Sequence, residues 1–203
     1  MLILYNIMLA NRISPVFDAN KAIQVVLYVA NKLKRRDFHK IFKVIYFADK
    51  AHLAEWGRTV SADTYIAMEA GPVPTKIYDM FKVVRGDSLF SSNEEMRAFY
   101  NQFFKVEGDY ILVPQKGADM KYLSKSDVDA LDKSLAENKD LSFDAIKDKS
   151  HDFAWSQTAR DQAIDFAYML FEEGASEEYV KYVKESMLLD NYLARKNKRY
   201  EHR

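Results

Sequence analysis

The chain has 203 residues, 48% apolar and 30% charged, so it can bury a sizeable core and is not disordered as a whole. It contains no cysteine, which excludes a disulfide scaffold, a thiol nucleophile and a cysteine-based zinc site, and suits a reducing cytoplasm. The formal net charge is zero, which is atypical of a dedicated nucleic-acid-binding protein.

The charges are unevenly distributed. Residues 1–60 carry 10 basic and 4 acidic side chains, whereas residues 121–180 carry 7 basic and 14 acidic ones. The basic third could contact phosphates or an acidic partner, or the basic and acidic parts could face each other. The apolar start, Met1–Leu9, is too short to span a bilayer and lacks a basic leader, so we expect no membrane segment there. We hypothesise that the native protein begins at Met8.

The first part of the chain predicts two buried helices. Asp18 is a suitable N-cap for a helix over about residues 19–34, whose apolar middle predicts burial on all sides. Asp37 is the expected cap of a second helix over about residues 38–56, rich in aromatic side chains that predict a core position. Gly57 fits the left-handed residue that ends such a helix.

Residues 64–69 contain Thr, Tyr and Ile in weak alternation, which predicts a strand. The Gly-Pro-Val-Pro run at 71–74 should end it, with Pro74 in the first turn of a helix that reaches about Val84. Trp56, at the end of the preceding helix, is expected in the core.

Residues 99–106 and 109–113, joined by Glu107-Gly108, predict a hairpin. Because a lone hairpin is marginally stable, we expect it to join the earlier strand in one antiparallel sheet of about three strands. Four further helices are predicted over about 125–137, 143–149, 161–173 and 176–200, the first two capped by Ser124 and Ser142. The predicted fold is a mainly α (α+β) single domain with this small sheet inserted.

Two histidines sit in patterns that could carry chemistry. Asp49 and His52 lie three residues apart on one helix face, either as a carboxylate-oriented base or metal ligand, or as a hydrogen-bonded pair that fixes the helix end. No further ligands have suitable spacing, so no metal site is expected. His151 stands between Ser150 and Asp152, and three consecutive residues cannot converge as a triad.

A triad of Ser61, His52 and Asp63 would lack an oxyanion-hole turn, so we expect no catalytic residue and no cofactor. Arg58 and Asp63 bracket a short connection and could pair, or Arg58 could bind a carboxylate of a partner.

Tyrosines surround the Gly-Pro-Val-Pro corner in the sequence. Tyr46, Tyr65 and Tyr78 could line one face beside it as a stiff, amphipathic contact surface, or they could pack in the core.

The stretch at 43–78 resembles the signature of the Panacea domain, also called the SocA-like antitoxin domain. The elements D-x-x-H-L, GR, DTY and GPVP recur there in the expected succession, and blocks at 124–132 and 149–155 continue it with SH-x-x-x-W. Ala62 and Ala70 depart from the pattern, where Gly and a larger residue are expected. The family-motif residues, taken as a candidate binding surface, are Asp49, His52, Trp56, Gly57, Arg58, Asp63, Tyr65, Gly71, Pro72, Val73, Pro74, Tyr78, His151 and Trp155.

The resemblance implies a mainly helical bacterial or phage-associated protein that neutralises a co-encoded protein toxin by direct binding, with no established catalytic mechanism or required cofactor. We divide the chain into an N-terminal segment (1–17), the Panacea-like domain (18–160) and a helical extension packed on it (161–203). Two alternatives stay open: a winged-helix-like nucleic-acid-binding regulator, motivated by the basic first third and the hairpin, and a small hydrolase that uses His52 or His151. The oligomeric state is not predicted.

Overall fold

The structure is a computed structural model that describes residues 14–87 and 94–201, with side chains as far as residue 197. The hypothesis about the native start falls outside these residues. In chain order the elements are α2 (Ala19–Lys32), α3 (Phe38–Trp56), β1 (Tyr65–Met68), β2 (Gly71–Pro74), α4 (Thr75–Arg85), α5 (Glu94–Asn101), β3 (Phe104–Glu107), β4 (Ile111–Pro114), the short 3₁₀ helix η1 (Met120–Tyr122), α6 (Lys125–Asn138), α7 (Phe143–Ser150), α8 (Phe153–Ser156), α9 (Phe166–Glu172) and α10 (Glu177–Glu201). The mainly α prediction is confirmed.

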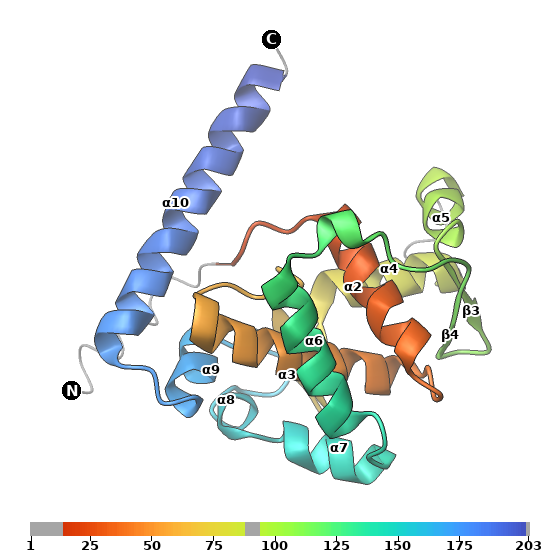
Figure 1. The fold of residues 1–203 in the computed structure, drawn as a ribbon, viewed down its shortest axis with the longest axis horizontal. Helices are drawn as coiled ribbons and strands as arrows, with labels where there is room; N and C mark the ends of the chain where they lie inside the picture. The colour runs from red at the N-terminus through yellow and green to blue at the C-terminus, as the bar shows by residue number, and fades with distance from the viewer. Residues whose placement is uncertain (1–13, 88–93, 202–203) are drawn as a thin grey trace.

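Helix α3 lies at the centre of the molecule, and α2, α6, α7, α9 and β2 pack around it (Figure 1). Its apolar residues face almost every direction, which is why it is covered on most sides. Several of its charged side chains are therefore buried as well, among them Lys43 and Asp49. Buried charged groups are costly unless they are paired, so α3 needs polar partners on the elements that surround it.

Two hydrophobic clusters meet at α3. The first joins the amino-terminal half of α3 to α2, α4, β3, β4 and α6, and includes Val26, Ile41, Phe81, Leu112 and Leu131. The second joins the other half of α3 to β1, α8, α9 and α10, and includes Tyr46, Leu53, Tyr65, Leu170 and Val183. The carboxyl-terminal helices thus pack on one end of the central helix, and the hairpin β3–β4 packs near the other.

The predicted caps at Asp18, Asp37, Ser124 and Ser142 and the predicted end of a helix at Gly57 are confirmed. The side chains of Asp18, Asp37, Ser124 and Ser142 each accept a hydrogen bond from a backbone N–H in the first turn of the following helix. Ser124 also forms a reciprocal capping box with Asp127. Gly57 ends α3 at a φ of 68°, in the left-handed region.

The prediction of one three-stranded sheet is wrong. Strand β1 pairs antiparallel with β2, with Tyr65 opposite Pro74, while β3 pairs separately with β4. The other edge of β1 is taken by residues 161–164: the N–H of Ile164 donates to the Tyr65 carbonyl, 2.8 Å away. The Gly-Pro-Val-Pro run is therefore a strand rather than a break. Its prolines lack an N–H, which an edge strand tolerates.

Four other local predictions also fail. The strand expected at 99–106 starts only at Phe104, as β3, because the residues up to Asn101 belong to helix α5. The helix expected from 161 begins at Phe166, because the preceding residues run alongside β1. Trp56 is 56% exposed rather than buried, because it is the last residue of α3. Pro74 is the N-cap of α4 and not a first-turn residue.

Gly71 predicts a sharp difference between two glycine substitutions. A Cβ at Gly71 (φ 94°) would lie 2.3 Å from Ser150 Oγ and 2.9 Å from Lys43 Cε, whereas one at Gly174 (φ 82°) would meet nothing within 4 Å. Gly174→Ala should cost about 1–2 kcal/mol of left-handed strain. Gly71→Ala should cost at least about 3 kcal/mol, because a clash in a packed site adds to that strain. Urea unfolding of both variants measures this, and equal losses would contradict the close approach.

Candidate functional site

Asp49 holds the segment after α3 against that helix. Its carboxylate is fully buried and accepts hydrogen bonds from the Ser61 N–H (2.8 Å), the Ser61 hydroxyl and the Tyr65 hydroxyl (2.7 Å). Burial raises the pKa of Asp49 to about 6, although these hydrogen bonds favour the ionised form. The expected pairing of Asp49 with His52 is not formed, because each side chain bonds to a different segment.

His52 is also used inside the fold. Its Nδ1 donates to the Arg58 carbonyl at 2.7 Å, which leaves Nε2 to accept from the Ser126 hydroxyl at 3.1 Å. Burial lowers the pKa of His52, so the ring is neutral near pH 7. With 1% of its surface exposed, it is closed to a substrate in this structure.

Arg58 pairs with Asp127 on α6 at 2.9 Å, and Lys21 on α2 reaches the same carboxylate at 2.9 Å. Burial works against ionisation of Asp127, but hydrogen bonds from Lys21 and Ser124 outweigh it and lower its pKa to about 2. The expected Arg58–Asp63 pair is therefore wrong. About half of the Arg58 side chain stays exposed, so this residue lies at the surface as well as in the network.

Asp63 serves as a distant cap for α4. Its carboxylate accepts from the N–H groups of Lys76 and Ile77, at 3.1 and 2.8 Å, and from the Thr75 hydroxyl at 2.9 Å. The N-cap residue itself, Pro74, has no side-chain oxygen that could do this. Asp63 thereby fixes α4 relative to the segment that Asp49 holds.

The second motif block supports the β1–β2 hairpin. His151 stacks on Trp155 with ring centroids 3.8 Å apart, and the Trp155 indole N–H donates to the Met68 carbonyl at 2.9 Å. On the other side, Lys43 Nζ donates to the Pro72 carbonyl at 2.7 Å. Burial lowers the pKa of Lys43 to about 7.

These contacts make most of the family-motif residues internal supports. Of the three tyrosines expected near the corner, Tyr46 and Tyr65 are buried and contact each other edge to face. The third, Tyr78, lines the largest-volume cavity of those described for residues 14–87 and 94–201, together with Val73.

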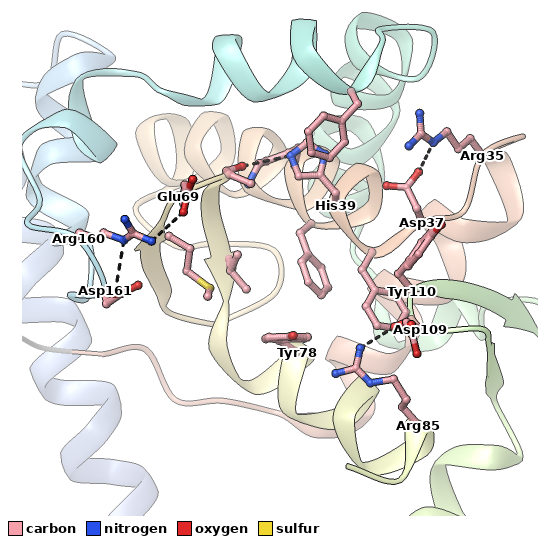
Figure 2. Close-up of a pocket in the computed structure, with 17 residues that line it drawn as sticks. Arg35, Asp37, His39, Glu69, Tyr78, Arg85, Asp109, Tyr110, Arg160 and Asp161 are labelled. Carbon is pink, nitrogen blue, oxygen red and sulfur yellow. Dashed lines mark hydrogen bonds and ion pairs between the residues drawn. The ribbon is translucent and has the colours of Figure 1, made fainter. Parts of the chain in front are cut away.

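That cavity has a volume of about 660 Å³ and is the candidate functional site (Figure 2). It lies between the start of α3, the β1–β2 hairpin, α4 and the β3–β4 turn. Its apolar lining is Phe38, Phe42, Met68, Val73, Tyr78, Tyr110 and Phe143. Phe143, at the start of α7, stacks on His39 with ring centroids 4.0 Å apart. Burial lowers the pKa of His39 to about 4, so this ring is neutral at pH 7.

Charged side chains surround the cavity in pairs. Arg35 lies 2.6 Å from Asp37, and Arg160 lies 2.8 Å from Glu69 (Figure 2). Arg85 donates to the Asp109 carbonyl at 2.6 Å. The cavity therefore combines an apolar floor with a rim of both charge signs. This chemistry suits an apolar side chain flanked by polar groups and does not suit a polyanion.

Many basic side chains of the first third form ion pairs or hydrogen bonds within the protein. Lys50 pairs with Asp152 and Glu172, each at 3.0 Å, and Lys32 pairs with Asp132 at 2.6 Å. Lys40 donates to carbonyls at the end of α6. The basic first third and the acidic stretch at 121–180 thus face each other at several points.

The part of the chain that the structure describes has neither a candidate metal site nor a candidate membrane-spanning helix. Across residues 14–87 and 94–201, no group of three His, Asp or Glu side chains could hold a metal ion. None of the helices in these ranges is both long and apolar enough to cross a membrane.

Sequence reasoning missed most of the cavity. Phe38 and Phe42 were recognised only as core residues of a helix, and Tyr110 only as part of a strand. Arg35 and Arg160 carried no signal, because the cavity forms where segments distant in the chain meet. An aromatic residue at the first position of a short helix, as at Phe143, is the one local hint.

Comparison with known families agrees with this architecture. Residues 41–156 match the model of the antitoxin SocA-like, Panacea domain family. The match covers more than half of the chain, so the chain belongs to this family, and the resemblance seen in the sequence is confirmed. The matched span runs from α3 to α8 and includes most of the cavity lining. No curated protein and no solved structure matches the chain.

The burial of Asp49 predicts a pH dependence of stability. Its pKa is about 6 in the folded protein and about 3.8 when unfolded, so the folded state binds more protons between these values. The free energy of unfolding should fall by about 2 kcal/mol from this group as pH rises from 4 to 7. Asp49→Asn should remove this fall, as measured by urea unfolding at a series of pH values. The exposed Asp144→Asn is the control, and an unchanged profile in Asp49→Asn would contradict the assignment.

Proposed function

We propose that this protein neutralises a co-encoded protein toxin by binding it directly, with the surface around the cavity as the contact site. Membership of an antitoxin family supports a toxin as the partner class. The observation that carries the choice of surface is the cavity itself, whose apolar floor is open and whose rim charges are already paired.

The cavity is suited to hold one apolar anchor of a partner. Binding energy at protein interfaces concentrates in a few aromatic or aliphatic side chains that fill a pocket, surrounded by contacts that exclude water. Around this cavity Met68, Tyr110 and Phe143 are all exposed by more than a third, although apolar side chains of this size are usually buried. A toxin segment with a protruding apolar residue would cover them.

Rigidity of the site would favour this mode of binding. Hydrogen bonds from Lys43 to the Pro72 carbonyl and from Trp155 to the Met68 carbonyl hold the β1–β2 hairpin. Asp63 holds α4 by accepting from the Ile77 N–H. A preformed site loses little conformational entropy when it binds, so more of the contact energy appears as affinity. Neutralisation would then follow from steric occlusion of the toxin's active region.

The two alternative functions have less support. A nucleic-acid-binding regulator needs free basic side chains, but Lys21, Lys50 and Arg58 of the basic third all pair with carboxylates. A hydrolase needs a reachable base, but His52 is 1% exposed and its ring nitrogens are both engaged.

Substitutions at the cavity mouth should separate toxin binding from folding. Met68→Glu and Tyr110→Glu place a charge where the apolar anchor would sit, and each should weaken toxin binding by about 30-fold or more. Co-expression with the neighbouring toxin gene should then fail to restore growth, and calorimetry with purified toxin should give the loss of affinity.

Met120→Glu is the matched control, because Met120 is exposed to a similar degree but lies outside the cavity lining. All three variants should keep the thermal midpoint of the parent protein. Full rescue by both cavity variants would refute the cavity as the contact site, and failure of the parent protein to bind the toxin would refute the function.

A further inference from the structure

Helix α10 leaves an apolar face uncovered. Its inner face packs on the body through Val180, Val183 and Met187, all buried. Beyond these residues Asn191 donates to the Ser14 carbonyl at 2.8 Å, and the remaining carboxyl-terminal part of α10 extends away from the other elements (Figure 1). The 25 residues of α10 give it a length of about 37 Å, and only the first part is needed for the contact with the body.

The opposite face carries an apolar stripe, whose residues are 45–63% exposed: Tyr182, Leu188, Leu189, Tyr192 and Leu193. Tyr182 and Leu189 are seven residues apart, and Tyr192 and Leu193 follow Leu189 by three and four, so these residues lie on one side of the helix. A stripe of this kind on a projecting helix is typical of a helix that pairs with another.

Charged residues on the side of the stripe indicate which partner fits. Glu185 lies in the amino-terminal half of the stripe and Lys196 beyond its carboxyl-terminal end, both on the side of the stripe. Glu185 lies 3.9 Å from Lys181 of the same helix, but both side chains are more than 60% exposed, so Glu185 can still face a second charge. A second α10 in antiparallel orientation would bring opposite charges together. A parallel copy would place Glu185 against Glu185 and Lys196 against Lys196, which is repulsive.

We propose that α10 pairs with α10 of a second copy of this chain, antiparallel, about a two-fold axis near residues 190 and 191. In this register Leu189 lies opposite Tyr192 of the other copy, Leu188 opposite Leu193, and Glu185 opposite Lys196. Each of these pairs occurs twice, because a two-fold interface repeats every contact. The two bodies lie at opposite ends of the paired helices and so do not collide.

The pairing leaves the cavity free. None of the residues that line it belongs to α10, and α10 lies beyond the span that matches the antitoxin family. The proposal is therefore independent of the toxin-binding function. The dimer presents two cavities, so a toxin that is itself dimeric would be bound at two points.

Charge reversal tests the pairing and its direction. In sedimentation velocity over a range of concentrations, the parent protein should shift from the 23.6 kDa of one chain to twice that mass. Glu185→Lys and Lys196→Glu should each raise the dissociation constant by about tenfold, because both pairs turn from attractive to repulsive. The double variant Glu185→Lys/Lys196→Glu should regain the parent affinity.

A mixture of the two single variants extends the test. In an antiparallel pair, one chain of each variant restores opposite charges at both positions, so mixed dimers should form in preference to either homodimer. Asp190→Lys is the matched control, since it makes the same change in charge to one side of the stripe and should leave the dimer intact. Circular dichroism confirms that each variant keeps its helix content.

Three results would overturn the proposal. The first is a parent protein that stays monomeric at all concentrations. The second is a dimer in which the double variant does not recover, because the antiparallel register would then be wrong. The third is a monomer that dimerises only after residues 1–13 are removed, which would make the amino-terminal segment the occupant of the stripe. If the stripe is covered only when toxin is added, the parent protein alone stays monomeric, which is the first result.

Discussion

The hydrogen bonds to the buried carboxylate of Asp49 are the constraint on which the rest of the site depends. A carboxylate without water needs donors, and Ser61 and Tyr65 supply them from the segment that follows α3. This fixes the start of β1 against the central helix. The same segment carries Asp63, which caps α4, so one connection sets the position of the hairpin on one side and of α4 on the other. These two elements form adjoining walls of the cavity.

The residues that mark the family and the residues that line the cavity are mostly different sets. The motif supplies buried contacts: the His52 ring to the Arg58 carbonyl, Asp63 to α4, and Trp155 to the hairpin. A change at these positions breaks the fold. The cavity floor and rim are exposed, so a change there alters the surface and leaves the buried contacts in place. The signature therefore identifies the architecture, and under the proposed function the choice of partner falls to the side chains around the cavity.

Local chemistry accounts for what sequence reasoning predicted well. Caps such as Asp18 and Ser124, and the left-handed Gly57, act within a few residues of the chain, so their effect can be recognised without a fold. Several of the failures concern partners distant in sequence. Residues 64–69 were correctly predicted as a strand, but its neighbours were assigned wrongly, because the pairing of β1 with residues 161–164 has no local signal. The Asp49–His52 pair failed for the same reason.

The sequence by itself determined the helical class, the helix ends, the absence of thiol chemistry and the family, since these depend on composition, on spacing and on motifs in a fixed order. Only the tertiary structure decided which polar side chains meet, that Trp56 is exposed, that the basic third pairs with acidic residues of α6 and beyond, and that aromatic residues from α3, α4 and α7 enclose one cavity. The physical reason is that burial and pairing are properties of positions in space. A buried charge chooses its partner among the groups that packing brings within hydrogen-bond distance, and sequence separation does not limit that choice.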